Sequence, residues 1–204
     1  MKKVLIVFVT LVMNWGNGFT QNTNSSTLAE RGNRPQTSRI SIETDPTAFF
    51  FNGFSLAVRR SATLAPRLTL GIGWYKTTLP KFYVEASSDN VGKGWQVNNS
   101  GGDLFADYHF FDPNNGLSAG MALSVYQFTV RRQQKQASYH SFIQTLRVGY
   151  MWRPFNKWDA LYLFPWVGIS TGQRISGTDR IDGEVFETPT WSIVPAFQLG
   201  YSFY

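Results

Sequence analysis

The 204-residue sequence contains no cysteine. This absence excludes disulfides, thiolate metal sites, a lipid-bearing cysteine and a cysteine nucleophile. Charged residues are also scarce: they make up 16% of the chain, no more than the aromatic residues, whereas about a quarter is usual in soluble domains. The composition also argues against a disordered chain, because 43% hydrophobic residues offer too much apolar surface to leave unburied. The length suits one domain.

Long apolar runs are missing as well, apart from a short one at residues 4–13. At about 1.5 Å per residue, this run is too short for a helix that crosses a bilayer core of about 30 Å. Two lysines precede the run, and the small residues Gly16, Gly18 and Thr20 follow it. This layout is typical of a secretory signal peptide. It predicts residues 1–20 as the signal, with cleavage after Thr20 or, alternatively, after Gly18.

The rest of the chain divides into a short lead and a domain of alternating residues. Residues 21–38 are polar and lack an apolar period, which predicts a flexible N-terminal lead. From residue 39 to 204 the apolar period is two, as in a β-strand whose two faces differ. The last segment is the clearest: large residues share one face at Trp191, Ile193, Pro195, Phe197, Leu199, Tyr201 and Phe203.

The alternation predicts eight strands. They cover residues 39–50, 53–63, 67–78, 103–111, 117–131, 139–153, 158–173 and 189–204. Tight connections rich in turn residues are predicted at 63–66, 112–116 and 154–157, with a hairpin at Asn52-Gly53. Long polar connections are predicted at 79–102, 132–138 and 174–188. Apart from that first hairpin, short and long connections alternate, and an even number of strands puts both ends of the domain on the tight-turn side.

The sizes of the alternating residues decide which face is the core. A soluble barrel of the lipocalin type also alternates, but it turns apolar residues inward. Large apolar residues from eight strands would overfill so narrow an interior, and the other face would expose Gly, Ala and Ser to water. With the faces reversed, small and polar residues fill the lumen and large ones meet lipid. The predicted fold is therefore all-β: an eight-stranded antiparallel up-and-down transmembrane β-barrel over residues 39–204.

Aromatic residues near the strand ends support this prediction. Trp74 and Trp191 lie toward the long connections, and the tight-turn side carries Tyr108, Phe110, Tyr150, Trp152, Tyr201 and Phe203. Two such belts are typical of the two interfaces of a bilayer. A strand from Trp191 to Phe203 extends about 40 Å, or about 30 Å along the membrane normal once it is tilted.

The signal peptide, the eight segments and the ending Gln198-Leu199-Gly200-Tyr201-Ser202-Phe203-Tyr204 resemble small bacterial outer-membrane β-barrel proteins of the OmpX/OmpA-like class. The resemblance covers residues 39–204. The phrases Ile42-Glu43-Thr44-Asp45-Pro46 and Lys93-Gly94-Trp95 are similar to an uncharacterised subgroup of this class. It implies residence in the outer membrane, outer-membrane lipid as the surroundings, and the barrel assembly machinery as a partner. Gln198, Gly200 and Phe203 match the signal that this machinery reads, except that Tyr204 follows the last outward aromatic residue.

Residues capable of catalysis are few. Some barrels of this size modify lipids with a His and a Ser at the outer rim, and here His140 stands next to Ser141. Because alternate residues of a strand lie on opposite faces, however, His140 faces lipid and Ser141 faces the lumen, so their side chains diverge. By the same alternation, which we call parity, His109 faces the lumen on the tight-turn side. We therefore predict no catalytic, cofactor-binding or metal-binding residue, and a nucleic-acid partner is implausible for an exported chain.

The basic residues of the long connections leave two interpretations open. Arg131, Arg132, Lys135, Arg174 and Arg180 could attract lipopolysaccharide phosphates or an extracellular ligand. The favoured interpretation is an ordinary solvated loop, because the acidic residues Asp179, Asp182, Glu184 and Glu187 lie close by in the sequence. The main hypothesis is a non-enzymatic outer-membrane barrel that displays loops for interaction or envelope integrity. A lipid-modifying enzyme and a soluble lipocalin-like binder are the alternatives.

Four charged residues are predicted to meet inside the barrel. By parity, Glu43, Arg59, Asp107 and Arg147 face the lumen at similar depths. Two acids and two bases at one level would neutralise each other, and unpaired charges there would be costly. We expect them to form a network that closes the lumen rather than a path for ions.

Overall fold

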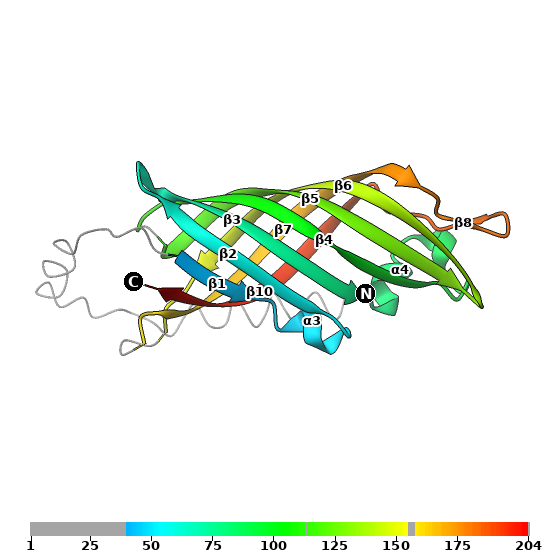
Figure 1. The fold of residues 1–204 in the computed structure, drawn as a ribbon, viewed down its shortest axis with the longest axis horizontal. Coiled ribbons are helices and arrows are strands. Elements are labelled where there is room, and N and C mark those ends of the chain that lie inside the picture. Colours follow the sequence, from blue (N-terminus) through cyan, green and yellow to red (C-terminus); the bar gives the residue numbers. More distant parts are fainter. Residues whose placement is uncertain (1–39, 113, 155–157, 204) are drawn as a thin grey trace, which may run out of the picture. The chain divides into compact units, whose positions relative to one another are not determined.

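A computed structural model describes residues 40–112, 114–154 and 158–203. The predicted signal peptide, 1–20, and the predicted lead, 21–38, lie outside the described residues, as does Tyr204. Eight strands close into a barrel in the order β1-β10-β7-β6-β5-β4-β3-β2, and every neighbouring pair is antiparallel. The predicted eight-stranded up-and-down barrel is therefore confirmed (Figure 1).

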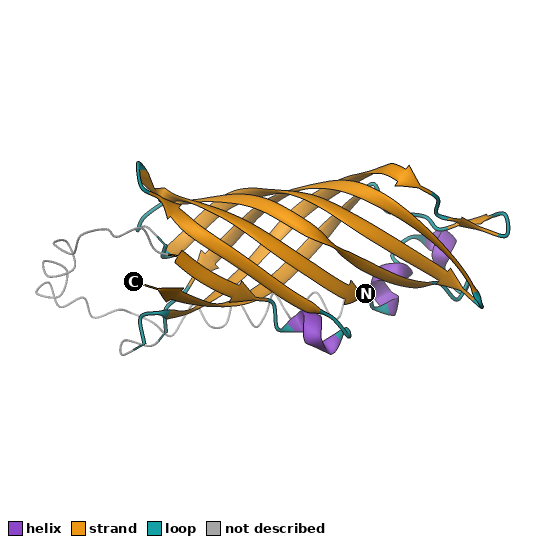
Figure 2. Cartoon of the chain, viewed as in Figure 1, coloured by secondary structure: helices purple, strands orange, loops and turns teal. Residues whose placement is uncertain are grey.

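The barrel strands are β1 (Ile40–Thr44), β2 (Phe54–Ala62), β3 (Ala65–Thr78), β4 (Gln96–His109), β5 (Gly116–Arg132), β6 (Lys135–Met151), β7 (Leu161–Gly177) and β10 (Trp191–Phe203). The smaller elements are α3 (Thr47–Phe50), α4 (Lys81–Val84), the 3-10 helix η1 (Ser88–Asn90) and the hairpin of β8 (Arg180–Ile181) and β9 (Glu184–Val185). All of them belong to connections at one end of the barrel, which we call the long-loop end (Figure 2). The opposite end, with the β2–β3, β4–β5 and β6–β7 connections, is the tight-turn end.

None of the helices in the described part of the chain is long and apolar enough to cross a membrane.

The prediction of a first strand over residues 39–50 is wrong in its second half, because β1 ends at Thr44 and α3 follows. Pro46 has no N–H to donate to a strand ladder but suits a first helical turn. The carboxylate of Asp45 also accepts hydrogen bonds from the N–H and the hydroxyl of Thr47, at 2.8 and 2.6 Å. These local preferences turn the chain out of the strand.

Three predicted connections are wrong in detail. The hairpin at 52–53 is instead the end of the connection 45–53, which carries α3. β4 begins at Gln96, well inside the predicted loop 79–102. β5 and β6 likewise extend through most of the predicted loop 132–138 and leave only a tight turn between them.

The sequence analysis missed these strand extensions because, near the long-loop end, apolar residues lie on the inner face and polar residues on the outer face. In β4, Val97 points inward and is fully buried, while Gln96 is exposed. In β5, Val130 is fully buried and Arg131 is exposed. Apolar-in and polar-out is the pattern of a sheet that faces water. A pattern that seeks large residues on the outer face cannot detect a strand beyond this exchange.

Between its two ends, the barrel presents large apolar side chains on its outer surface. Those at least half exposed include Leu70, Ile72, Leu104, Leu146, Val148, Val167 and Ile169. The residues proposed as aromatic belts border this apolar band: Trp74 and Trp191 are exposed toward the long-loop end, and Tyr108, Phe110, Tyr150, Tyr201 and Phe203 toward the tight-turn end. Trp152 lies at the tight-turn end but is half-buried.

Inside the long-loop end lies a hydrophobic cluster, which we call the cap core. It consists of Val84, Trp95, Val97, Phe128, Val130, Tyr139, Ile181 and Phe186. The extended parts of β4, β5 and β6 supply one side, and the α4–η1 segment and the β8–β9 hairpin supply the other. The rings of Phe128 and Tyr139 stack with their centroids 5.2 Å apart, and Trp95 meets Phe186 edge-on at 5.8 Å. The β3–β4 and β7–β10 connections are therefore packed together by an apolar core.

We expect Phe186→Ala to loosen this end without unfolding the barrel. Phe186 is 4% exposed, and truncating a buried Phe typically costs about 3–5 kcal/mol. Hydrogen exchange of the amides in 179–190 should accelerate, while the amides of β2 and β3 keep their protection. Phe50→Ala, at a position that is 83% exposed, is the control. Unchanged exchange in 179–190 would contradict the cap core.

Candidate functional site

The structure brings the four lumen charges into one connected chain. Arg59 lies between two acids: its Nε is 3.1 Å from Oε1 of Glu43 as an ion pair, and its Nη2 donates to Oδ2 of Asp107 at 3.0 Å. Arg147 binds Asp107 with two hydrogen bonds, from Nε to Oδ1 at 2.9 Å and from Nη2 to Oδ2 at 2.7 Å. None of the four is more than 5% exposed. Asp107 thus sits between two guanidinium groups.

A fifth residue, Tyr162, belongs to this network and was missed by the sequence analysis. Its hydroxyl donates to Oε1 of Glu43 at 2.7 Å, and the residue is fully buried. Tyr162 lies on β7, so the chain of contacts runs from β7 through β1, β2 and β4 to β6. An inward-facing tyrosine in a predicted strand was the available signal, but large residues were expected to point outward.

Glycines in the wall make room for the network. A Cβ at Gly120 would lie 2.0 Å from Oδ1 of Asp107, and one at Gly200 would lie 2.2 Å from the ring of Tyr162. Both contacts are far closer than atoms allow, so a side chain at either position would force Asp107 or Tyr162 to move. Gly200 is also one of the residues of the proposed assembly signal, and the structure gives it a packing reason of its own.

Aromatic rings surround the two guanidinium groups. The Arg59 guanidinium lies 4.8 Å from the centroid of the Phe164 ring, and that of Arg147 lies 4.7 Å from Phe105 and 5.2 Å from Trp166. Such cation–π contacts contribute most where water is excluded. The lumen at this level is therefore filled by paired charges and rings.

The other residues of the proposed assembly signal lie on β10. Gln198 is half-buried, while Phe203 is exposed on the outer surface, where it pairs with Ile40 of β1. β10 and β1 are the strands that close the barrel, over five paired positions. The signal residues therefore belong to the strand that makes the closing contact.

The structure separates the two residues weighed for catalysis, His140 and Ser141, as expected: Ser141 is buried inside, and His140 is exposed. It also makes a pairing that the sequence did not suggest. Nδ1 of His140 lies 3.1 Å from the hydroxyl of Ser176 on β7. An irregularity in the β6–β7 register at His140 and Ser141 aligns these two side chains. His109 is fully buried in the lumen.

Of the five basic residues named in the sequence, Lys135 and Arg174 are paired with acids, and Arg132 lies over the ring of Trp95. Lys93 lies 2.7 Å from Glu184, Lys135 lies 2.5 Å from Asp182, and Arg174 pairs with Asp179. The Lys93 ammonium, by donating a hydrogen bond, lowers the pKa of the exposed Glu184 carboxyl. The pair's contribution to stability is thus present at neutral pH and is lost as the pH falls through that lowered value. In the described residues, no three His, Asp or Glu side chains are grouped to hold a metal ion.

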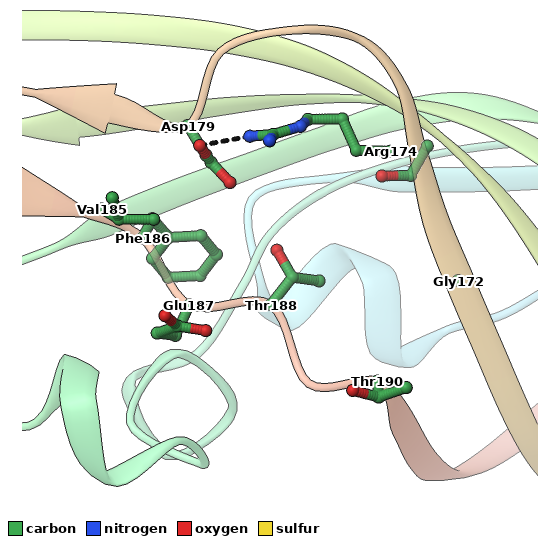
Figure 3. A pocket seen from close by; sticks show the side chains of 9 residues that line it. Gly172, Arg174, Asp179, Val185, Phe186, Glu187, Thr188 and Thr190 are labelled. Carbon is green, nitrogen blue, oxygen red and sulfur yellow. Dashed lines mark ion pairs between the residues drawn. The ribbon is translucent and has the colours of Figure 1, made fainter.

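A hollow of about 220 Å³ opens beside the Arg174–Asp179 pair, at the rim of the long-loop end (Figure 3). We call it the rim hollow. β6 and β7 supply Ser141, Gly172 and Arg174, and the connection from β7 to β10 supplies the remaining wall. Its polar side chains are Ser141, Arg174, Asp179, Glu187, Thr188 and Thr190. Of these, the sequence analysis named Arg174, Asp179 and Glu187 as loop charges but not as a site.

No family model matches the sequence, and no curated protein matches it either. Among solved structures, the chain is similar to a major outer membrane protein from Thermus thermophilus, with 16% identity, 82% of this chain and 100% of that chain covered, and a TM-score of 0.48. It is also similar to the N-terminal β-barrel domain of Pseudomonas aeruginosa OprF, with 11% identity, 81% and 97% coverage, and a TM-score of 0.45. It is similar as well to Neisserial surface protein A, with 9% identity, 81% of this chain and 96% of that chain covered, and a TM-score of 0.43. These similarities are too low to carry a role over to this chain.

We expect Arg147→Ala to lower the free energy of unfolding by about 3–5 kcal/mol, because it leaves a buried carboxylate with one partner fewer. Arg131→Ala is the matched control, since Arg131 is exposed on β5. Thermal and urea unfolding in detergent micelles measure both variants against the unmodified chain. An Arg147→Ala protein that unfolds like the control would show that the network contributes nothing to stability.

Proposed function

We propose that this chain is a non-enzymatic integral outer-membrane protein. It would display the connections of its long-loop end, ordered by the cap core, at the cell surface for interaction or for envelope integrity. The observation that carries the proposal is the side-chain distribution: an apolar outer band bordered by aromatic residues, around a lumen of polar and charged side chains. A soluble lipocalin-like barrel would need the reverse arrangement. A closed barrel also leaves few backbone groups without partners, as a bilayer requires.

The same surface supports the proposed partners. Outer-membrane lipid would surround the apolar band, and the ending at 198–203 would be read by the barrel assembly machinery. A barrel exported across the inner membrane needs the predicted signal at residues 1–20, which is outside the described residues. Nucleic acid has no place in this proposal.

A closed lumen supports a role in display rather than in transport. The charge network and its surrounding rings fill one level, and the cap core fills another nearer the long-loop end. Eight strands leave an interior just wide enough for side chains to fill. An ion would have to displace both layers in order to cross.

The proposal predicts a membrane-bound protein that does not conduct. The full chain, expressed in a Gram-negative host, should remain in carbonate-washed outer membranes. After purification and insertion into planar bilayers, it should give no steady conductance steps under conditions in which a porin does. Recovery in the soluble fraction would contradict the membrane assignment, and stable single-channel steps would contradict the closed lumen.

One observation favours a second candidate, a lipid-modifying enzyme at the outer rim. His140 and Ser176 lie within hydrogen-bond distance on the exposed surface, which is the contact a base needs to activate a serine. Catalysis also calls for a group that orients the histidine. Among the described residues, no acid hydrogen-bonds to His140, so this candidate ranks second.

Mass spectrometry of lipid A separates the two candidates. We expect the same acyl pattern in cells with the gene, in cells without it, and in cells that carry Ser176→Ala or His140→Ala. Ser138→Ala, on the same strand as His140, serves as the control. An acyl change that requires both His140 and Ser176 would replace the display proposal with the enzymatic one.

A further inference from the structure

The wall of the barrel is closed along only part of β10. Eleven of the 13 residues of β10 pair with β7, but only five, 199–203, pair with β1. β1 is short because the chain turns out of the strand after Thr44 (Figure 1). Residues 191–198 of β10 therefore have no paired strand on their β1 side in the described part of the chain.

The hydrogen bonds show which residues of β10 turn their backbone groups toward this unpaired side. The N–H of Ser202 donates to the carbonyl oxygen of Ala160, on the β7 side. In an antiparallel strand, alternate residues direct their N–H and C=O to opposite neighbours, and the register between β10 and β7 has no shift. The backbone groups of Ile193, Pro195 and Phe197 therefore point away from β7. We call this stretch, 193–197, the β10 edge.

Two prolines prevent a strand from covering the β10 edge. If β1 continued in register, Pro46 would lie opposite Phe197, but a proline has no N–H to donate to the carbonyl oxygen there. In the middle of the edge, Pro195 likewise cannot donate to a partner strand, as is usual where an edge is kept from pairing. The hydroxyl of Tyr83, on α4, already donates to the carbonyl oxygen of Ile193 at 3.3 Å. A second copy of β10 or another strand is therefore a poor partner for this edge.

The β10 edge lies at the depth of the apolar band. Ile193 and Pro195 pair with Ile169 and Val167 of β7, two residues of that band that are at least half exposed. Backbone groups without partners are costly in hydrocarbon, and open sheet edges are not left bare there. The N–H and the C=O of Phe197 have no partner among the described residues, so this position calls for a molecule that supplies one.

Unpaired polar groups also lie on the lumen side of the edge. Oε1 of Gln198 and Nε1 of Trp166 are buried and form no hydrogen bond within the described ranges. Trp166 lies opposite Ala196, one position from Gln198's neighbour Phe197. Buried polar atoms are rarely left unpaired, and here one atom accepts and the other donates. Both faces of the wall at this point therefore suit a group that can donate and accept.

These features together select an apolar molecule that ends in a carboxylic acid. A residue of the missing strand would exchange one hydrogen bond with the N–H and one with the C=O of Phe197. A carboxylic acid has an O–H donor beside a C=O acceptor, so it can form the same two bonds. Exclusion of water favours its neutral form, and its hydrocarbon chain can remain in the apolar band.

We propose that the β10 edge binds the carboxyl group of a long-chain carboxylic acid dissolved in the membrane, in place of the missing part of β1. The Phe197 N–H donates to the acid's carbonyl oxygen, and the acid's O–H donates to the Phe197 carbonyl oxygen. The hydrocarbon chain lies on the outer surface, against the side chains of the band. The site rests on the membrane barrel proposed above, and it requires no opening of the lumen to ions.

The test uses the full chain in liposomes at mildly acidic pH, with a palmitic acid that carries a photoreactive diazirine. Mass spectrometry maps the crosslinks, which we expect in 191–199. Unlabelled palmitic acid should compete about tenfold better than its methyl ester, which has the same chain but no O–H donor, as for the loss of one hydrogen bond. This comparison needs no variant, so it decides the question even where a variant fails to assemble.

A pair of variants at one position locates the hydrogen bond. Phe197→Pro removes the N–H at the edge without removing a bond to β7, because this residue's backbone groups point away from β7. We expect the advantage of the acid over the ester to disappear. Phe197→Ala, which removes the same ring but keeps the N–H, is the matched control and should retain the advantage. Circular dichroism melting checks that both variants fold.

Several outcomes would overturn the proposal. Equal competition by the acid and the ester would leave water as the partner of the edge, and crosslinks spread evenly around the barrel would show ordinary lipid contact. A dimer that the photoreactive acid does not label would assign the edge to a second copy of the chain. Failure of the membrane assignment would appear separately, as recovery of the chain in the soluble fraction.

Discussion

Asp107 is the residue on which the interior of this barrel depends. Its two carboxylate oxygens accept three hydrogen bonds from two arginines that come from β2 and β6. Burying a charge in so small an interior is tolerable only when it is paired and hydrogen-bonded. Because the partners come from different strands, the bonds form only at one register. We infer that this network specifies the register of the barrel as well as filling its lumen.

The glycines of the wall follow from the same constraint. A carboxylate, a tyrosine ring and two guanidinium groups cannot share a narrow lumen with other side chains of ordinary size. Gly120 and Gly200 supply the missing volume directly opposite Asp107 and Tyr162. Small residues in the lumen are thus complements of particular large ones, and not a uniform lining.

The barrel divides into two sections that obey opposite rules. Within the apolar band, large residues point outward and the inside is polar; beyond it, the extended strands turn apolar residues inward to form the cap core. A single closed sheet therefore changes from a surface suited to lipid to one suited to water along its own length. This change fixes the connections of the long-loop end, and with them the wall of the rim hollow.

Much of the fold could be predicted from the sequence, because strand alternation is a local property. A period of two with large residues on one face indicates the barrel and its outer surface, and parity alone directs Glu43, Arg59, Asp107 and Arg147 inward. The alternation continues in the parts of β4, β5 and β6 beyond the band, but there the inward residues are apolar, so an expectation of polar residues inside fails. The predicted first strand also fails at Pro46, where local chemistry ends β1 early.

What only the tertiary structure decided is which of these side chains meet. Tyr162 reaches Glu43 across 119 positions of sequence, and Asn90 reaches Glu187 across 97. His140 lies opposite Ser176 of β7 at an irregularity in the β6–β7 register, where their side chains come within hydrogen-bond distance. Within the apolar band, the sequence by itself determined on which face most side chains of a strand lie, since alternation follows from the backbone of one strand; Tyr162, a large residue that points inward, is an exception. Partners depend on the register and stagger of the whole closed sheet, and no single strand contains that information.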